Sequence, residues 1–240
     1  MSVSKSERRS SMKSMLRRKL SSSSAAPLPF RFLNQTANSL AEHLAMLQQQ
    51  RRSTLTRGEF RKQAWSKHPE RAPTVTADAI AFDAMARLVA WTVLEKTELS
   101  ERAQVYAFWV ETTAASLQLH DFSSACAVLA GLEVTSVYRL RETKGRLTRA
   151  QSESLEAVRA IASSEHNYSG YRAALAEAAK QPRVPHLMIH LHDLVGIDEG
   201  NPEGARKDEL FDEVMGAVLA ATPAEASAAP AAAAPPPPPP

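Results

Sequence analysis

The sequence predicts an all-α fold, and three observations support this prediction. Apolar residues recur at intervals of three and four through the middle of the chain, as on the buried face of a helix. Alternating runs of Val, Ile and Thr, which indicate strands, are almost absent from this stretch. Residues typical of helix ends divide this stretch into separate helices, namely Gly131, the Thr148/Gln151 pair and Pro182. We therefore expect a single orthogonal, bundle-like domain of several helices.

Composition divides the chain into three segments. Residues 1–29 are Ser-rich and basic with few bulky side chains, which predicts a disordered tail because little apolar area offsets the entropy of ordering. Residues 30–221 are long enough for one helical domain with a sizeable core. Residues 222–240 are rich in Ala and Pro and end in six consecutive prolines, which favour an extended polyproline tail.

Three apolar stripes mark three helices in the first half of the domain. The first stripe consists of Phe82, Met85, Ala86, Val89 and Val93. The second consists of Val105, Phe108, Trp109, Thr112, Ser116 and Leu119. The third consists of Phe122, Ala125, Cys126 and Leu129. Gly131 follows the third stripe in the position of a helix C-cap, so we expect that helix to end there.

Further helices follow in the second half. Thr148 and Gln151 are spaced as in a capping box, and they open a helix that carries Leu155, Val158 and Ala162. The next stripe consists of Tyr168, Tyr171, Leu175 and Ala178, and Pro182 ends it. The last stripe consists of Phe211, Val214, Met215, Val218 and Leu219. Acidic residues lie opposite this stripe, namely Asp208, Glu209, Asp212 and Glu213.

The charge of the chain is unevenly distributed. Residues 1–20 hold seven Lys or Arg against one Glu, a net charge of +6, so the other residues together carry −3 of the total of +3. A slightly acidic domain does not fit a nucleic-acid binder, which carries its basic surface on the folded domain. Three interpretations of the Arg/Ser-rich tail stay open: sites for basophilic kinases, a transit peptide, and contact with an anionic membrane surface. The proline tract is a candidate ligand for proline-binding modules.

Motifs for covalent chemistry are missing from the sequence. The eight glycines are scattered and form no phosphate-binding loop, and no Gly-x-Ser-x-Gly elbow occurs. Cys126 lies within an apolar stripe, which indicates a packed thiol in a reducing compartment. No apolar run approaches the roughly 18 residues of a membrane span, and no secretory signal precedes the domain. We expect a soluble, cytoplasmic protein that is not an enzyme and has no cofactor.

Three histidines lie close together in the sequence. His186 and His190 are four residues apart, on one face of a helix where a zinc ion can bind, and His192 follows. No acid or cysteine completes a ligand set at helical spacing, since Asp193 is adjacent rather than one turn away. The alternatives are a partner contact and a helix packed by Leu187, Ile189 and Leu194, with its histidines at the surface.

Four motifs in the last third of the chain together resemble a known family. They are Asn167-Tyr168-Ser169-Gly170-Tyr171-Arg172, Val184-Pro185, Leu191-His192-Asp193-Leu194 and Glu199-Gly200-Asn201-Pro202. In this order and spacing they resemble the catalytic domain of Ras-type guanine-nucleotide exchange factors, the RasGEF family. Upstream segments continue the resemblance from about Leu33, namely Leu40–Leu44, Gln63–Lys67, Glu101–Ala103, Leu119–Phe122, Ala130–Leu132 and Val137–Leu140.

The resemblance implies a function and a set of contact residues. Members bind the switch regions of a small GTPase and favour its nucleotide-free state, without covalent chemistry. Arg139 aligns with an Arg that approaches the switch region, and His190 stands where the family usually carries a Tyr that faces the GTPase. We add Asp193 on the same segment as His190. Asp208, Phe211 and Asp212 lie where the helical hairpin that opens the nucleotide site begins.

The sequence also departs from the family pattern. Only about 20 residues separate the Glu-Gly-Asn-Pro turn from the proline tail, so the second hairpin helix and the closing stretch are expected to be missing. His120 and Asp121 replace an Asn pair, and Met188 replaces a Gly. Three readings stay open: an exchange factor, a GTPase-binding or scaffold protein that lost the prying element, and an unrelated helical protein or His-based enzyme. The target GTPase is not specified by these residues.

Overall fold

A computed structural model describes residues 35–219, and this part of the chain is helical throughout, as the sequence predicted. The two predicted tails, 1–29 and 222–240, lie outside the described residues. Within residues 35–219 the only strand-like pairing is an isolated bridge between Asp121 and Val184. No helix in this range has both the length and the apolar character needed to cross a bilayer.

The chain forms α-helices of very different lengths joined by short turns. In chain order they are α2 (Ala37–Arg52), α3 (Ala64–Lys67), α4 (Pro73–Leu94), α5 (Leu99–Gln118), α6 (Phe122–Leu132), α7 (Thr135–Tyr138), α8 (Arg141–Lys144), α9 (Arg149–Ala162), α10 (Ser169–Glu177), α11 (Leu187–Gly200) and α12 (Ala205–Leu219). Three 3-10 helices lie between them, namely η2 (Arg57–Gln63), η3 (Pro69–Arg71) and η4 (Ala178–Lys180).

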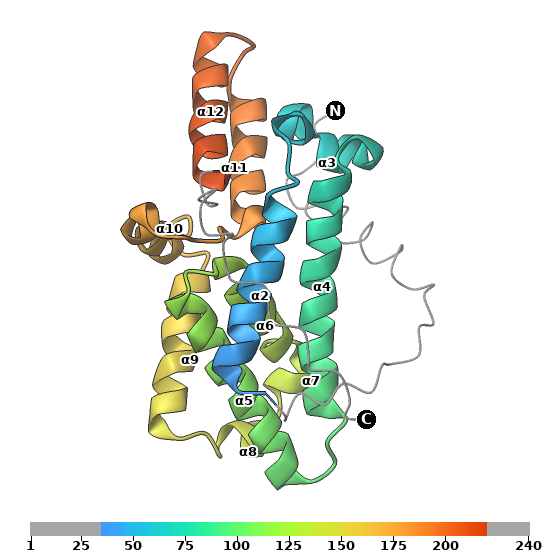
Figure 1. Cartoon of the computed structure of the whole chain (residues 1–240), viewed down its shortest axis with the longest axis vertical. Coiled ribbons are helices and arrows are strands. Elements are labelled where there is room, and N and C mark those ends of the chain that lie inside the picture. Colours follow the sequence, from blue (N-terminus) through green and yellow to red (C-terminus); the bar gives the residue numbers. More distant parts are fainter. Residues whose placement is uncertain (1–34, 220–240) are drawn as a thin grey trace, which may run out of the picture.

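The body of the molecule is built around α6. Helices α2, α4 and α5 pack against it, and α9 lies against α5 (Figure 1). The apolar stripes predicted for α4, α5 and α6 meet in one core that includes Val89, Val93, Trp109, Val128 and Leu132. The Trp109 indole N–H donates to the buried Thr92 hydroxyl at 2.9 Å, which satisfies the polar atoms of that core. Leu119 was predicted within the second stripe, but it follows the end of α5 and is exposed.

Gly131 lies inside α6 rather than at its cap. The helix continues to Leu132, and Gly131 has no positive φ, so the predicted C-cap is wrong. A Cβ atom at this position would lie 2.5 Å from the backbone oxygen of Ala86 and 2.6 Å from Cβ of Val89. The glycine therefore permits the close approach of α4 and α6.

The capping box predicted at the start of α9 is confirmed. The Gln151 backbone N–H donates to the Thr148 hydroxyl at 3.2 Å, and the Thr148 N–H donates to the Gln151 side chain at 2.8 Å. Leu155 and Val158 then face the core, as the periodicity indicated. The following helical segment, α10 with η4, ends at Lys180, shortly before Pro182.

Helices α11 and α12 form a pair that projects from one end of the body (Figure 1). A second apolar cluster fills the base of this pair. It joins Leu187, Leu191 and Leu194 of α11 and Phe211, Met215 and Val218 of α12 to Leu55, Phe60, Ala64, Ala72 and Val75. The last helix of the described chain is thus packed against the segment that precedes α4.

Candidate functional site

His190 is buried in the structure, although the sequence placed it at a partner-facing surface. Its residue is 3% exposed, and its Nε2 lies 2.8 Å from the Tyr171 hydroxyl. The same hydroxyl accepts the backbone N–H of His186 at 3.0 Å. Burial lowers the pKa of His190 to about 4, so the ring is neutral at physiological pH. His190 therefore fastens α11 to α10 rather than presenting a surface contact.

The three histidines do not converge on a metal site. The His186 ring stacks on Phe82 of α4 with a centroid distance of 5.2 Å, and burial lowers its pKa to about 3. His192 is exposed, whereas His186 and His190 belong to the network at the base of α11. Residues 35–219 contain no group of three His, Cys, Asp or Glu side chains that is arranged to hold a metal ion.

Asp193 holds α10 and α11 together. Its two carboxylate oxygens accept from the Arg172 guanidinium at 2.8 and 3.0 Å, a bidentate pair. Arg172 also donates to the backbone oxygen of Asn167 at 2.8 Å. The Asn-Tyr-x-x-Tyr-Arg motif and the Leu-His-Asp-Leu motif of the sequence are therefore joined by this ion pair, and Asp193 is only partly exposed.

The predicted contact residues of α12 are engaged with η2. Phe211 was predicted as a contact, but it is 7% exposed because the apolar stripe of α12 packs against the base of the pair. The guanidinium groups of Arg57 and Arg61 lie 5.6 and 4.6 Å from its ring centroid. Asp212 forms an ion pair with Arg57, and Asp208 accepts from Arg61 at 3.0 Å. Both aspartates remain largely exposed to solvent.

Arg139 directly follows α7 and is exposed. Within residues 35–219 its side chain has no hydrogen-bond or ion-pair partner. The preceding Tyr138 is 52% exposed, with the Lys144 ammonium 4.1 Å from its ring centroid. Helix α7 contacts α4, whose Trp91 is also exposed. We call Trp91, Leu94, Val134, Tyr138 and Arg139 the α4–α7 surface; all four apolar members are exposed.

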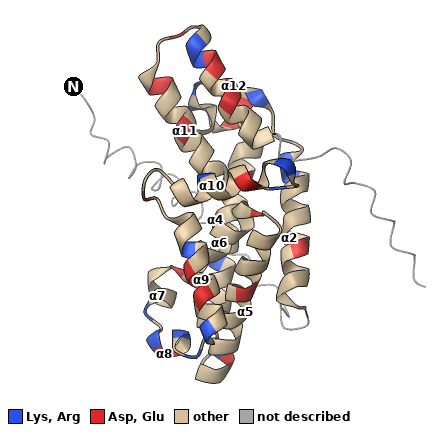
Figure 2. Cartoon of the chain, turned by 90° about the vertical axis from the view of Figure 1, so that its left-hand side faces the viewer, with Lys and Arg blue, Asp and Glu red and all other residues tan. Residues whose placement is uncertain are grey.

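The predicted residues thus lie in three separate places. Arg139 follows α7, and α7 lies near the end of the body opposite the α11–α12 pair (Figure 1). His190 and Asp193 are on α11, and Asp208, Phe211 and Asp212 are on α12. Sequence reasoning missed the exposed Trp91, which lies outside the apolar stripe of its helix. An aromatic residue off the core stripe was the available signal. Acidic and basic residues are interspersed over the described helices (Figure 2).

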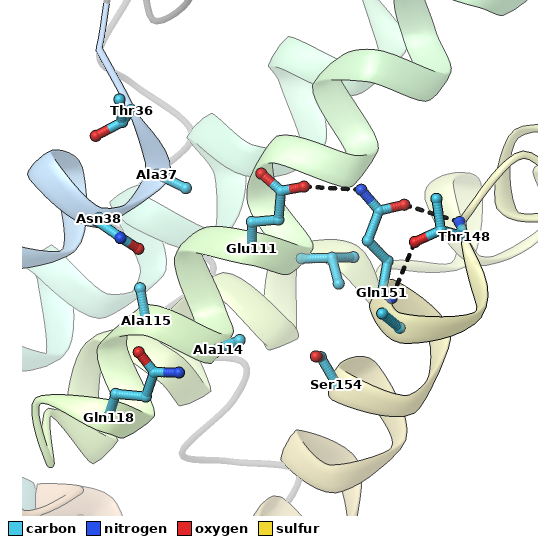
Figure 3. Close-up of a pocket in the computed structure, with 12 residues that line it drawn as sticks. Thr36, Ala37, Asn38, Glu111, Ala114, Ala115, Gln118, Thr148, Gln151 and Ser154 are labelled. Carbon is cyan, nitrogen blue, oxygen red and sulfur yellow. Dashed lines mark hydrogen bonds between the residues drawn. The ribbon is translucent and has the colours of Figure 1, made fainter.

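A cavity of about 460 Å³ lies between the start of α2, α5 and the start of α9 (Figure 3). Small and polar side chains line it, among them Ala114, Ala115 and Ser154, and Gln151 donates to Glu111 at 2.7 Å. A second cavity of about 580 Å³ shares Thr148 and Gln151 with the first. Neither contains any of the six predicted contact residues.

The helical architecture and the four ordered motifs are those expected of a Ras-type exchange-factor domain, and comparison with known sequences leads to the same class. The chain matches the RasGEF domain over residues 39–212, and it belongs to this family of exchange factors. It is 32% identical over 164 residues to Ras guanine nucleotide exchange factor V of Dictyostelium discoideum, covering 68% of this chain and 8% of that protein.

Mammalian relatives are similar over the same part of the chain. Identity is 27% over 169 residues to Ras-specific guanine nucleotide-releasing factor 2 of Mus musculus, covering 70% of this chain and 14% of that protein. It is 27% over 171 residues to Ras guanyl-releasing protein 3 of Homo sapiens, covering 71% of this chain and 25% of that protein. The chain therefore spans a quarter or less of the length of these three relatives.

Proposed function

We propose that this chain is an exchange factor for a Ras-family small GTPase. The observation that carries the proposal is the RasGEF match over residues 39–212, which includes nearly all of the helical body and part of α12. Relatives named as Ras exchange or releasing factors support it. The chain would bind the nucleotide-free GTPase more tightly than the loaded one and so lower the barrier to nucleotide release.

The α4–α7 surface is the part of the body best suited to a protein partner. Exposed aromatic and apolar side chains beside an arginine are the composition of interface centres. The guanidinium of Arg139 is free, within the described residues, to form a bidentate bond to a partner carboxylate. We therefore keep Arg139 as the first proposed contact residue and add Tyr138 and Trp91 to it.

Helix α12 supports a second candidate, a protein that binds a GTPase without releasing its nucleotide. The apolar stripe of α12 is packed against α11 and η2, and Asp208 and Asp212 are paired with arginines. Both aspartates are largely exposed, but a partner that binds them has to compete with Arg57 and Arg61 for their carboxylates. Asp193 would contact a partner only through its exposed edge, because Arg172 holds both carboxylate oxygens.

The test is the release of fluorescent GDP from a panel of Ras-family GTPases with this chain titrated in. Faster release from one member supports exchange. We expect Arg139→Ala to slow that release by about 10- to 150-fold, since one charge-assisted hydrogen bond is worth about 1.5–3 kcal/mol. Arg71→Ala is the control, because Arg71 is equally exposed but lies on η3.

The other outcomes separate the two candidates. Capture of a nucleotide-free GTPase without faster release supports the binding protein. No capture and no release across the panel contradicts both candidates. Equal activity of the Arg139→Ala and Arg71→Ala variants removes the α4–α7 surface from the proposal.

The tails extend the proposal beyond the described residues. We propose that the protein is cytoplasmic and that residues 1–20, with a net charge of +6, bring it to anionic membranes. Deleting residues 1–26 should then weaken binding to liposomes that contain phosphatidylserine, and undiminished binding would contradict this role. The proline tract remains a proposed ligand for proline-binding modules.

A further inference from the structure

A buried charged cluster lies where α2, α4 and α6 meet. Arg52, the last residue of α2, is 4% exposed. One of its terminal nitrogens, Nη2, is 3.3 Å from Asp78 Oδ2 of α4 and 3.3 Å from the Ser123 hydroxyl of α6. Asp121, the N-cap of α6, is 0% exposed, and its Oδ1 accepts the Ser124 N–H at 2.9 Å.

Several polar atoms of this cluster lack partners among residues 35–219. They are Nε and Nη1 of Arg52, Oδ2 of Asp121, Oε1 of Gln48 and the Ser124 hydroxyl. Buried donors and acceptors that remain unpaired are costly, and internal water normally bridges them. The unpaired atoms include donors on the Arg52 guanidinium and acceptors on Gln48 and Asp121. A buried site that contains both kinds of atom is suited to hold water.

The cluster holds two carboxylates and one guanidinium. Burial raises the pKa of Asp121 to about 6. Burial also raises the pKa of Asp78, and the nearby charge of Arg52 reduces this increase. Arg51 of α2 and Tyr171 of α10 face the guanidinium as well, and burial raises the pKa of Tyr171. His186 and His190 of α11 face it too, and both stay neutral because burial lowers their pKa values. Arg52 is therefore the cation that allows the two buried acids to ionise.

The cluster supports the place where the chain leaves the body for α11. Val184 accepts the Phe122 N–H at 3.0 Å and donates its own N–H to the His120 carbonyl at 2.9 Å. Asp121 lies between these two residues, and α11 begins three residues after Val184. Any shift of the α6 N-terminus is thus passed to the base of the α11–α12 pair.

We propose that Arg52 is a positioning residue for the α11–α12 pair. It compensates the charges of Asp78 and Asp121, and internal water completes its remaining N–H groups. This holds the α6 N-terminus in the place against which the segment before α11 rests. The bearing of this role on nucleotide exchange rests on the proposed function, whereas the position of α12 is measurable without any GTPase.

Spin labels on α2 and α12 test the proposal. Glu42→Cys and Glu213→Cys place labels at two exposed positions, and the native Cys126 is buried. We expect Arg52→Met to broaden the distance distribution at least twofold at pH 7.5. At pH 5 the broadening should be clearly smaller, because Asp121, with its raised pKa of about 6, is mostly protonated there and no longer needs a cation. Arg52→Lys, which keeps the charge, should retain the narrow distribution at both pH values.

A purely structural role for the Arg52 side chain predicts a different result. Loss of packing alone would broaden the distribution equally at both pH values, and that outcome overturns the proposal, as does no broadening at all. The Asp78→Asn/Asp121→Asn background is the matched control, since Asn still caps a helix but carries no charge. There Arg52→Met should have little effect at either pH.

If the Arg52→Met variant does not fold at pH 7.5, the same substitution is made in the Asp78→Asn/Asp121→Asn background and folding is measured there. Folding restored by the two Asn substitutions supports charge compensation, and failure to restore it overturns the proposal. Nucleotide release is measured in parallel with the distances. Distances that respond as expected while no GTPase responds would leave this proposal standing and contradict the proposed exchange function.

Discussion

Removing the Tyr171 hydroxyl tests the network at the base of α11. Tyr171→Phe takes away one oxygen, while the ring can keep its packing, because it is 0% exposed and meets Phe122 edge-on at 5.5 Å. The His186 N–H then loses its acceptor at 3.0 Å, and His190 Nε2 loses its partner at 2.8 Å. Each unsatisfied buried group costs about 1–3 kcal/mol, so for these two groups we expect the free energy of unfolding to fall by about 2–6 kcal/mol.

Urea and thermal unfolding followed by circular dichroism measure this loss. For a domain of this size each 1 kcal/mol lowers Tm by about 2–4 °C, which predicts a decrease of about 4–24 °C. Tyr138→Phe is the matched control. It removes the same atom from a tyrosine that is 52% exposed, and we expect a change within about 0.5 kcal/mol.

One result would refute this reasoning. If Tyr171→Phe is as stable as Tyr138→Phe, the hydroxyl does not satisfy His186 and His190. The polar ties of α11 to the body would then be those that do not involve Tyr171, among them the Arg172–Asp193 ion pair.

Three further predictions concern packing, pH and capping. Gly131→Ala places a methyl group 2.5 Å from a backbone oxygen of α4; thermal unfolding should show a loss of about 1–3 kcal/mol, and unchanged stability would contradict the close helix approach. His186 and His190 stay neutral in the folded state while the unfolded chain binds protons below about pH 6.5, so lowering the pH from 7 to 5 should cost about 2 kcal/mol per histidine. Asp121, with its raised pKa of about 6, gives back about 1 kcal/mol over the same range; urea titrations at both pH values check the sum, and a net gain at pH 5 would show that the histidines are not buried. Thr148→Ala should cost about 1 kcal/mol, Thr148→Ser should cost less, and equal losses for the two would indicate that the hydroxyl does not cap α9.

Periodicity was sufficient to predict the helices of the body, because the core-facing residues of α4, α6 and α9 repeat at helical intervals. The capping box of α9 was also predictable, because both of its members lie within four residues of sequence. Gly131 was misjudged because a glycine is compatible with both a cap and a close helix contact. Only the position of α4, some 45 residues earlier in the chain, distinguishes the two.

The candidate site was less predictable than the fold. Histidine is often a surface residue, and no pattern in the sequence indicates that the Tyr171 hydroxyl, 19 residues away, meets His190 in the interior. Phe211 was assigned to a contact by its place in the family pattern, whereas its apolar stripe is used to cover η2. Arg139 was placed correctly as an exposed side chain, but the exposed Trp91 of α4 was not foreseen.

The packing of α12 on η2 determines when the domain can be completed during synthesis. Arg57 and Arg61 meet α12 across sequence separations of 155 and 147 residues. At about 5–20 residues per second, a ribosome would leave Leu55 and Phe60 without their α12 cover for roughly 7–30 seconds. During that time this apolar segment is open to chaperones and to other nascent chains. The first and last parts of the domain must therefore mature together, once α12 has been synthesised.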